Sequence, residues 1–175
     1  FSNAWSGDTT RTDAISLQNG IYVNTSAINS ADSNTIAAKT GTYLGTIRTT
    51  ATAGQTEDSY GGASQSGGKR YVWNNYNRVQ RSIGVIDAAD SWTYGTAAWR
   101  PANNSTSNIV QYVVGLSEDV VNGNAISTGS DYGGVGIGID STTVDSALLN
   151  NQGHSGYGQF SADYRGYPGL GYHYL

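Results

Sequence analysis

The 175-residue chain lacks several residue types that would suggest how it folds and what it binds. It has no cysteine, so a disulfide framework and a cysteine-based metal site are both excluded. Charged residues make up only 13% of the chain, and the net charge is −4. This argues against nucleic acid as a partner, because phosphate contacts require clustered cations. No apolar run reaches about 18 residues, so no membrane insertion is expected.

The residues that are abundant point to a folded β-rich protein. Gly, Ser, Thr and Asn supply 77 of the 175 residues, and aromatic residues supply 11%. A disordered chain of this polarity would carry more charge and fewer aromatic rings. Strong helix formers are scarce, with only two glutamates, whereas turn residues interrupt almost every window.

Short strands are predicted along most of the chain. The Asn19-Gly20 dipeptide predicts a hairpin over residues 14–23, because both residues tolerate a positive φ. Residues 24–42 are predicted to form a loop. The further expected strands lie at 42–50, 69–78, 91–100, 108–117 and 133–140, with another turn at Asn122-Gly123.

These patterns predict an all-β fold, either a β-sandwich or a jelly roll, with long loops rich in Gly, Asn, Ser and Thr. We expect one domain over residues 1–175, with residues 1–13 as an N-terminal arm. Because the chain starts at Phe1 without methionine, we expect it to be either a processed chain or part of a longer chain.

Neither histidine has neighbours that suggest a catalytic or metal-binding role. His154 and His173 stand apart from other metal-ligand types, so no metal, cofactor or catalytic residue is predicted. Among the carboxylates, Asp87, Asp90 and Glu118 are the candidates for a glycosidase, which needs two such groups across a sugar. The alternative role for aspartate here is the capping of tight turns.

Aromatic residues near arginine form the most informative pattern. Trp92, Tyr94, Trp99 and Arg100 are the candidate glycan-binding residues, since flat rings beside polar groups match the faces and hydroxyls of sugars. The alternative is packing in the core or at a subunit interface. The candidates for packing or oligomer contacts are Tyr43, Trp73, Tyr76 and Tyr112. Arg outnumbers Lys seven to two, a bias expected where guanidinium groups stack on rings or pair with carboxylates.

Several motifs in a fixed order resemble a domain found in the fibre and spike proteins of tailed bacteriophages and related particles. The resemblance covers residues from about 13 to 122. It is carried by Leu-Gln-Asn-Gly-Ile-Tyr-Val (17–23), Tyr-Leu-Gly-Thr-Ile-Arg-Thr-Thr (43–50), Gln-Thr-Glu-Asp-Ser (55–59), Lys-Arg-Tyr-Val-Trp-Asn-Asn-Tyr-Asn-Arg-Val-Gln-Arg (69–81), Asp-Ser-Trp-Thr-Tyr (90–94) and Trp-Arg-Pro-Ala-Asn (99–103). The loops at 24–42 and 61–68 are longer than the family leads us to expect, and receptor choice is expected to reside in them.

The resemblance implies a non-enzymatic structural protein on the virion surface, outside the cell. Its expected partners are copies of itself, with a homotrimer as the expected assembly, other virion proteins, and a glycan on the host surface. Two alternatives stay open. One is a capsid decoration protein without a receptor, and the other is a polysaccharide-degrading glycoside hydrolase of the tailspike type.

Overall fold

The protein is all-β, as predicted, with 38% of the described residues in strands that form several small sheets. The computed structural model describes residues 4–29, 33–62, 67–89, 91–130, 133–144, 146, 148–150 and 156–175. Within these ranges the helical content is one 3-10 turn, η1 (Ala102–Asn104), and no helix has the length and apolar character needed to span a bilayer. The strands are β1 (Trp5–Gly7), β2 (Thr10–Arg11), β3 (Ile15–Gln18), β4 (Ile21–Asn24), β5 (Ile28–Asn29), β6 (Thr35–Ile36), β7 (Gly45–Ile47), β8 (Asp58–Ser59), β9 (Lys69–Arg70), β10 (Val72–Asn74), β11 (Gln111–Val114), β12 (Val121–Ser130), β13 (Leu148–Asn150), β14 (Tyr157–Gly166) and β15 (Gly171–Tyr174).

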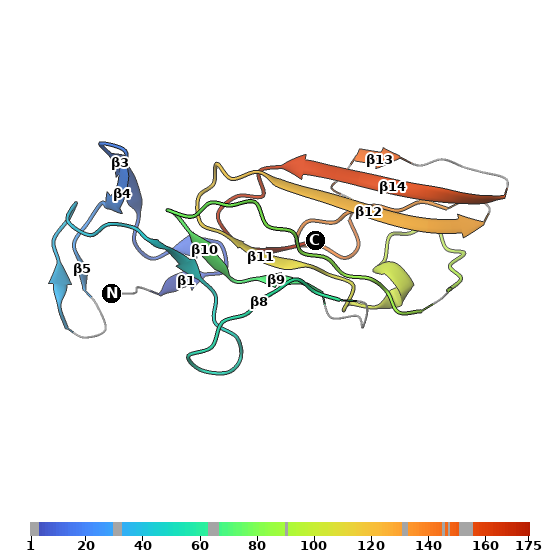
Figure 1. Ribbon diagram of the computed structural model, residues 1–175, viewed down its shortest axis with the longest axis horizontal. Coiled ribbons are helices and arrows are strands. Elements are labelled where there is room, and N and C mark those ends of the chain that lie inside the picture. Colours follow the sequence, from blue (N-terminus) through green and yellow to red (C-terminus); the bar gives the residue numbers. More distant parts are fainter. Residues whose placement is uncertain are drawn as a thin grey trace.

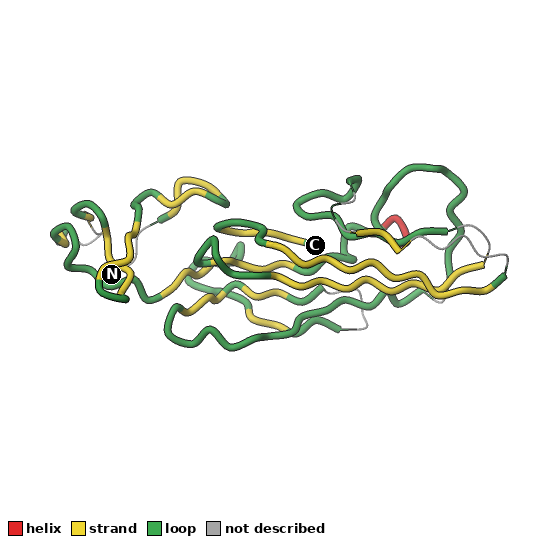
Figure 2. The backbone as a smooth tube through the Cα atoms, turned by 90° about the horizontal axis from the view of Figure 1, so that it is seen from above, coloured by secondary structure: helices red, strands yellow, loops and turns green. Residues whose placement is uncertain are grey.

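The molecule is elongated, with β1 to β6 at one end and the long strands β12 and β14 extending toward the other (Figures 1 and 2). The end that contains β1 to β6 consists of three two-stranded sheets, β1-β2, β3-β4 and β5-β6. The predicted Asn19-Gly20 hairpin is confirmed: β3 pairs with β4, and the two turn residues have φ values of 50° and 81°. The predicted loop at 24–42 instead contains the paired strands β5 and β6.

A four-stranded sheet in the order β15-β11-β9-β8 occupies the centre of the molecule. Its middle strand, β11, pairs antiparallel with the last strand of the chain and parallel with β9. Tyr112, Val113, Val114 and Leu116 are all buried here, and they form much of the hydrophobic core. The strand predicted within residues 108–117 is therefore confirmed as β11.

The second large sheet has the order β12-β14-β13, and its two long strands pair over ten residues (Figure 1). The predicted turn at Asn122-Gly123 is wrong, because both residues lie inside β12, opposite Arg165 and Tyr164. Gly123 lies in close contact with the end of the chain: a Cβ there would lie 3.0 Å from the end of the Leu175 side chain. The glycine makes room for the C-terminal residue instead of closing a hairpin.

Two of the predicted strands are absent from the described part of the chain. Residues 91–100 form an irregular segment without strand pairing, and residues 133–138 are likewise unpaired. The second segment nevertheless packs closely: Ile137 is buried, and a Cβ on Gly133 would meet the ring of Phe160 at 3.4 Å. The alternation of glycine and apolar residues therefore does not mark a paired strand, although Ile137 lies near Gly123 of β12 and Gly133 lies near Phe160 of β14.

Candidate functional site

The aromatic segment, defined here as residues 91–100, contains all four residues predicted to bind a glycan. Its three large rings stay substantially exposed, with Trp92 at 41%, Tyr94 at 42% and Trp99 at 39%. The guanidinium of Arg100 lies 3.8 Å from the centre of the Tyr94 ring, so a cation–π contact joins two of the four predicted residues. The segment therefore offers aromatic faces to solvent from a backbone outside any sheet.

The aromatic segment borders a wide open groove of ≈ 2270 Å³. Residues of β12 also line this groove, and its lining includes exposed apolar side chains, among them Val79, Ile86, Val120 and Ile126. Pockets for small ligands usually occupy about 300–1,000 Å³. The groove is therefore large enough for an extended polymer or for part of another protein surface.

Two of the residues predicted for packing belong to a compact stack near β7 and β10. The rings of Tyr43 and Trp73 lie face to face, with centres 5.8 Å apart and planes 23° apart. Arg11 covers the other side of Tyr43 at 4.5 Å, and it lies 5.2 Å from the centre of the Trp5 ring. Arg78 lies 5.9 Å from the ring of Trp73. We call these five side chains the ring stack.

Hydrogen bonds fix the ring stack at both ends. The Arg11 guanidinium donates to the hydroxyl of Tyr43 at 2.7 Å and to the carbonyl of Gly115. Trp73 Nε1 donates to Asp119 at 2.6 Å, and Arg78 pairs with the same carboxylate. Burial lowers the pKa of Arg78, but its hydrogen bonds to acidic neighbours outweigh that effect and raise the pKa above its ordinary value.

The ring stack requires a glycine beneath Trp73, at position 115. Trp73 lies so close to Gly115 that a Cβ at this position would overlap the indole ring. Gly115 directly follows β11, so the stack is seated on the end of the central sheet. The excess of arginine in the sequence is thus explained in part by guanidinium groups placed over rings, as predicted.

The other two packing candidates lie in different environments. Tyr112 is 7% exposed in the core, where burial raises the pKa of its phenol well above the ordinary value. Its hydroxyl has no hydrogen-bond partner among the described residues. Tyr76 is 60% exposed, so it is the one of the four that is open to contact with another molecule.

Two of the three carboxylates considered for a glycosidase, Asp87 and Glu118, have structural partners. Asp87 accepts hydrogen bonds from the backbone of Ala89 at 2.7 Å and from the side chains of Asn103 and Asn108. Glu118 accepts from Tyr22 and pairs with Arg78 at 3.2 Å. Asp90 and His154 lie outside the described residues. The interactions of Asp87 are those of a loop cap, which is the alternative that its sequence context suggested.

The second histidine, His173, is buried and pairs with an exposed carboxylate, that of Asp140. His173 is 3% exposed, and its Nδ1 lies 2.7 Å from Asp140. No group of three or more potential metal ligands occurs within the described ranges.

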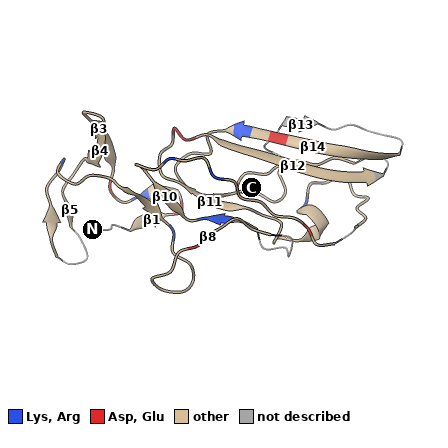
Figure 3. Cartoon of the chain, in the orientation of Figure 1, with Lys and Arg blue, Asp and Glu red and all other residues tan. Residues whose placement is uncertain are grey.

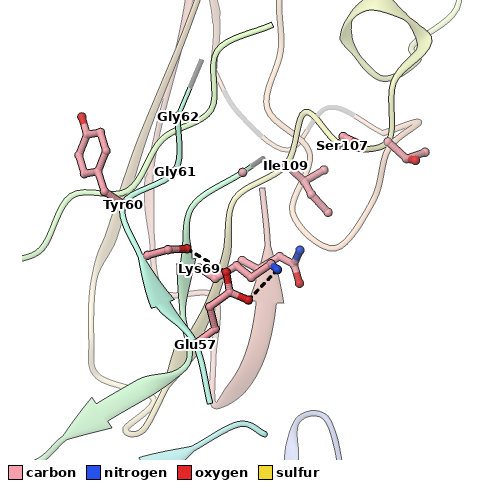
Figure 4. A pocket seen from close by; sticks show the side chains of 11 residues that line it. Glu57, Tyr60, Gly61, Gly62, Lys69, Ser107 and Ile109 are labelled. Atoms are coloured by element: carbon pink, nitrogen blue, oxygen red, sulfur yellow. Dashed lines mark hydrogen bonds and ion pairs between the residues drawn. The ribbon is translucent and has the colours of Figure 1, made fainter. Parts of the chain in front are cut away.

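A polar pocket of ≈ 520 Å³ lies on one face of the central sheet (Figure 4). Ser59, Lys69 and Gln111 are directly paired across β8, β9 and β11, so their side chains form one row. Glu57 joins this row, because residues two apart in an extended chain share a face. The rest of the lining is Tyr60, Gly61, Gly62, Gly67, Thr106, Ser107 and Ile109.

Inside the polar pocket, Glu57 is held by two hydrogen bonds. Its carboxylate accepts from Lys69 Nζ at 2.8 Å and from the Ser59 hydroxyl at 3.1 Å (Figure 4). The bond with Lys69 lowers the pKa of Glu57, and the same bond raises the pKa of Lys69. Basic and acidic residues lie side by side here and elsewhere along the chain, as Figure 3 shows for β8 and its neighbour. The pocket therefore has a charged lining that is internally neutral.

The polar pocket was not predicted from the sequence. Its parts come from three separate segments, within residues 57–62, 67–69 and 106–111, and a strand register cannot be read from composition. The available signal was weak: the Gln55 to Ser59 motif and the Lys69 to Arg70 pair both belong to the segments that resemble phage fibre domains.

Comparison with protein-family models, curated proteins and solved structures finds no match. The resemblance to phage fibre and spike domains therefore rests on the sequence motifs alone.

Proposed function

We propose that this chain is a structural domain of a fibre or spike on a tailed bacteriophage or a phage-like particle. In this proposal it assembles as a homotrimer on the virion surface and contacts other virion proteins. The aromatic segment contacts a glycan on the host surface, with Trp92, Tyr94, Trp99 and Arg100 as the contact residues.

The observation that carries the glycan half of the proposal is the exposure of the aromatic segment. Trp92, Tyr94 and Trp99 keep about two-fifths of their surface in water, although rings of this size are usually buried. Their rings can stack on the C–H faces of sugars, and the groove beside them has room for several sugar units.

The groove also supports the proposed assembly. Exposed apolar side chains such as Val79, Ile86 and Ile126 are gathered along one continuous surface. Contiguous apolar patches of this kind mark contact surfaces in soluble proteins. Packing against further copies would remove part of this surface from water, and it would leave the glycan-binding rings at the rim.

We further propose that the two large sheets pack as a β-sandwich. The support is contact between them: Leu175, which follows β15, lies against Gly123 of β12, and Ile137 packs near the same glycine. Asp140 adds a polar connection, since its backbone and side chain hydrogen-bond to residues 173 and 174 of β15. A jelly roll would require additional strand crossings between the sheets.

The proposal is tested by mass and by glycan binding of the purified chain. Light scattering is expected to give three times the 18.4 kDa of one chain. A glycan array is expected to show binding that falls in the Trp92→Ala/Trp99→Ala double variant but not in Tyr167→Ala, which removes an exposed ring that lies outside the groove lining. A monomer that binds no glycan, together with unchanged particle adsorption after deletion of the domain, would contradict the proposal.

A trimer that binds no glycan would instead support the decoration protein without a receptor. Release of reducing sugar from a bound polysaccharide would support the glycoside hydrolase.

A further inference from the structure

The polar pocket is separate from the aromatic segment. None of its lining residues belongs to residues 91–100, and only Ile109 borders both the pocket and the groove. Its volume of ≈ 520 Å³ falls within the usual range for pockets that enclose one small ligand. It is therefore a distinct concave site whose size suits a compact molecule.

The lining of the polar pocket presents hydrogen-bond donors. Lys69 carries three N–H groups, and the ion pair with Glu57 uses one of them. The Gln111 carbonyl accepts from the hydroxyls of Tyr71 at 2.5 Å and Tyr172 at 2.8 Å. These two bonds fix the amide, so its NH₂ group is the remaining donor of this side chain. The hydroxyls of Thr106 and Ser107 add groups that donate and accept.

The same lining disfavours a charged ligand. Glu57 neutralises Lys69, and both of its oxygens already accept hydrogen bonds. An anionic ligand would meet this carboxylate at close range, whereas a cationic ligand would meet the ammonium of Lys69. An uncharged molecule with many hydroxyls is repelled by neither of these two charges.

The walls add shape and a small apolar surface. Gly61, Gly62 and Gly67 bring bare backbone up to the pocket, and Ile109 supplies the apolar side chain inside it. A Cβ on Gly67 would overlap the carbonyl of Ile109, so this wall depends on glycine. The ring of Tyr60 points away from the Glu57–Lys69 pair (Figure 4), which leaves hydrogen bonds as the main means of recognition.

We propose that the polar pocket binds one uncharged sugar residue through Lys69, Gln111 and Ser107, with Ile109 against its C–H face. The inference rests on the proposed glycan-binding function and adds a second subsite to it. Glu57 acts as a positioning residue that holds Lys69 in place. A saccharide bound at both sites would be recognised by hydrogen bonds here and by ring stacking at the aromatic segment.

The test is a titration of the isotopically labelled protein with methyl glycosides of glucose, N-acetylglucosamine and glucuronic acid, followed by NMR. The uncharged glycosides are expected to shift the backbone amides of Gly62, Lys69 and Ser107, with a weaker response to glucuronic acid. Shifts confined to the indoles of Trp92 and Trp99 would overturn the pocket proposal and would leave the proposed function standing. A preference for glucuronic acid would overturn the pocket's proposed ligand class.

Three variants separate binding from folding. Gln111→Glu keeps an acceptor for both tyrosines but removes the amide donor, and it is expected to weaken sugar binding about tenfold. Gly62→Leu adds bulk at a pocket position where a Cβ meets no neighbour, so it is expected to block the pocket in a folded protein. Gly7→Leu is the matched control, because a Cβ there is equally unobstructed and the residue lies outside the pocket. Undiminished amide shifts in the folded Gly62→Leu protein would overturn the proposal.

Discussion

The ring stack and the aromatic segment are built from the same residue types but are placed in opposite environments. In the stack, Tyr43 and Trp73 lie between two guanidinium groups and are tied to the central sheet. In the segment, Arg100 covers Tyr94 alone, and the neighbouring Trp92 and Trp99 stay exposed. The comparison teaches that the support beneath a ring, and not the residue type, decides whether it stabilises the fold or is available to a ligand.

The largest expected difference between the two regions comes from adding one methyl group to a glycine in each. Gly115→Ala would displace the Trp73 ring and is expected to lower the free energy of unfolding by about 3 kcal/mol. Gly95→Ala places the new Cβ in open space and is expected to change the free energy of unfolding by less than about 0.5 kcal/mol. Chemical denaturation of the two variants measures both values. Equal losses would show that the stack is not the more tightly packed region.

Removing one arginine from each region is expected to show the same difference in stability between the regions, but a smaller one. Arg78→Ala removes two ion pairs and a ring contact, and should cost about 1 kcal/mol because the side chain is partly exposed. Arg78→Lys should recover only part of this, since an ammonium cannot reproduce the planar fork. Arg100→Ala should leave stability within about 0.5 kcal/mol of the parent. A larger loss in Arg100→Ala than in Arg78→Ala would reverse the comparison.

Tyr112, a buried ring outside the ring stack, is expected to make the stability of the protein depend on pH. Burial raises the pKa of Tyr112, so the unfolded chain ionises first as pH rises above the ordinary value of 10, and stability is lost there. Tyr112→Phe should therefore lose less stability between pH 9 and pH 11 than the parent. At neutral pH it should equal or slightly exceed the parent, because the hydroxyl has no partner among the described residues. Unfolding curves across this pH range provide the measurement, and identical pH profiles would contradict the assignment.

Local signals in the sequence predicted the fold better than long-range ones. The Asn19-Gly20 hairpin was predictable because two adjacent residues determine the turn, and β11 because Tyr112, Val113 and Val114 are aromatic or β-branched residues that favour strands. The same Asn-Gly dipeptide at 122–123 gave a wrong turn, since the glycine there serves contact with Leu175 at the far end of the chain.

The two candidate sites show the same difference between local and long-range signals in the sequence. The aromatic segment was identifiable from composition, although its predicted strand is absent. The polar pocket was not identifiable, because the row of Ser59, Lys69 and Gln111 depends on two registers, the antiparallel pairing of β8 with β9 and the parallel pairing of β9 with β11. Such a register depends on contacts between distant segments, and no local pattern encodes it.

The most direct test of the central claim is glycan binding by the Trp92→Ala/Trp99→Ala variant, measured together with its thermal unfolding. If the aromatic segment is a contact surface, binding to the best glycan of the array falls by about tenfold or more, and the unfolding temperature stays within about 2 °C of the parent. A drop of about 10 °C, or binding equal to that of the parent, would contradict the claim that these rings serve recognition and not folding.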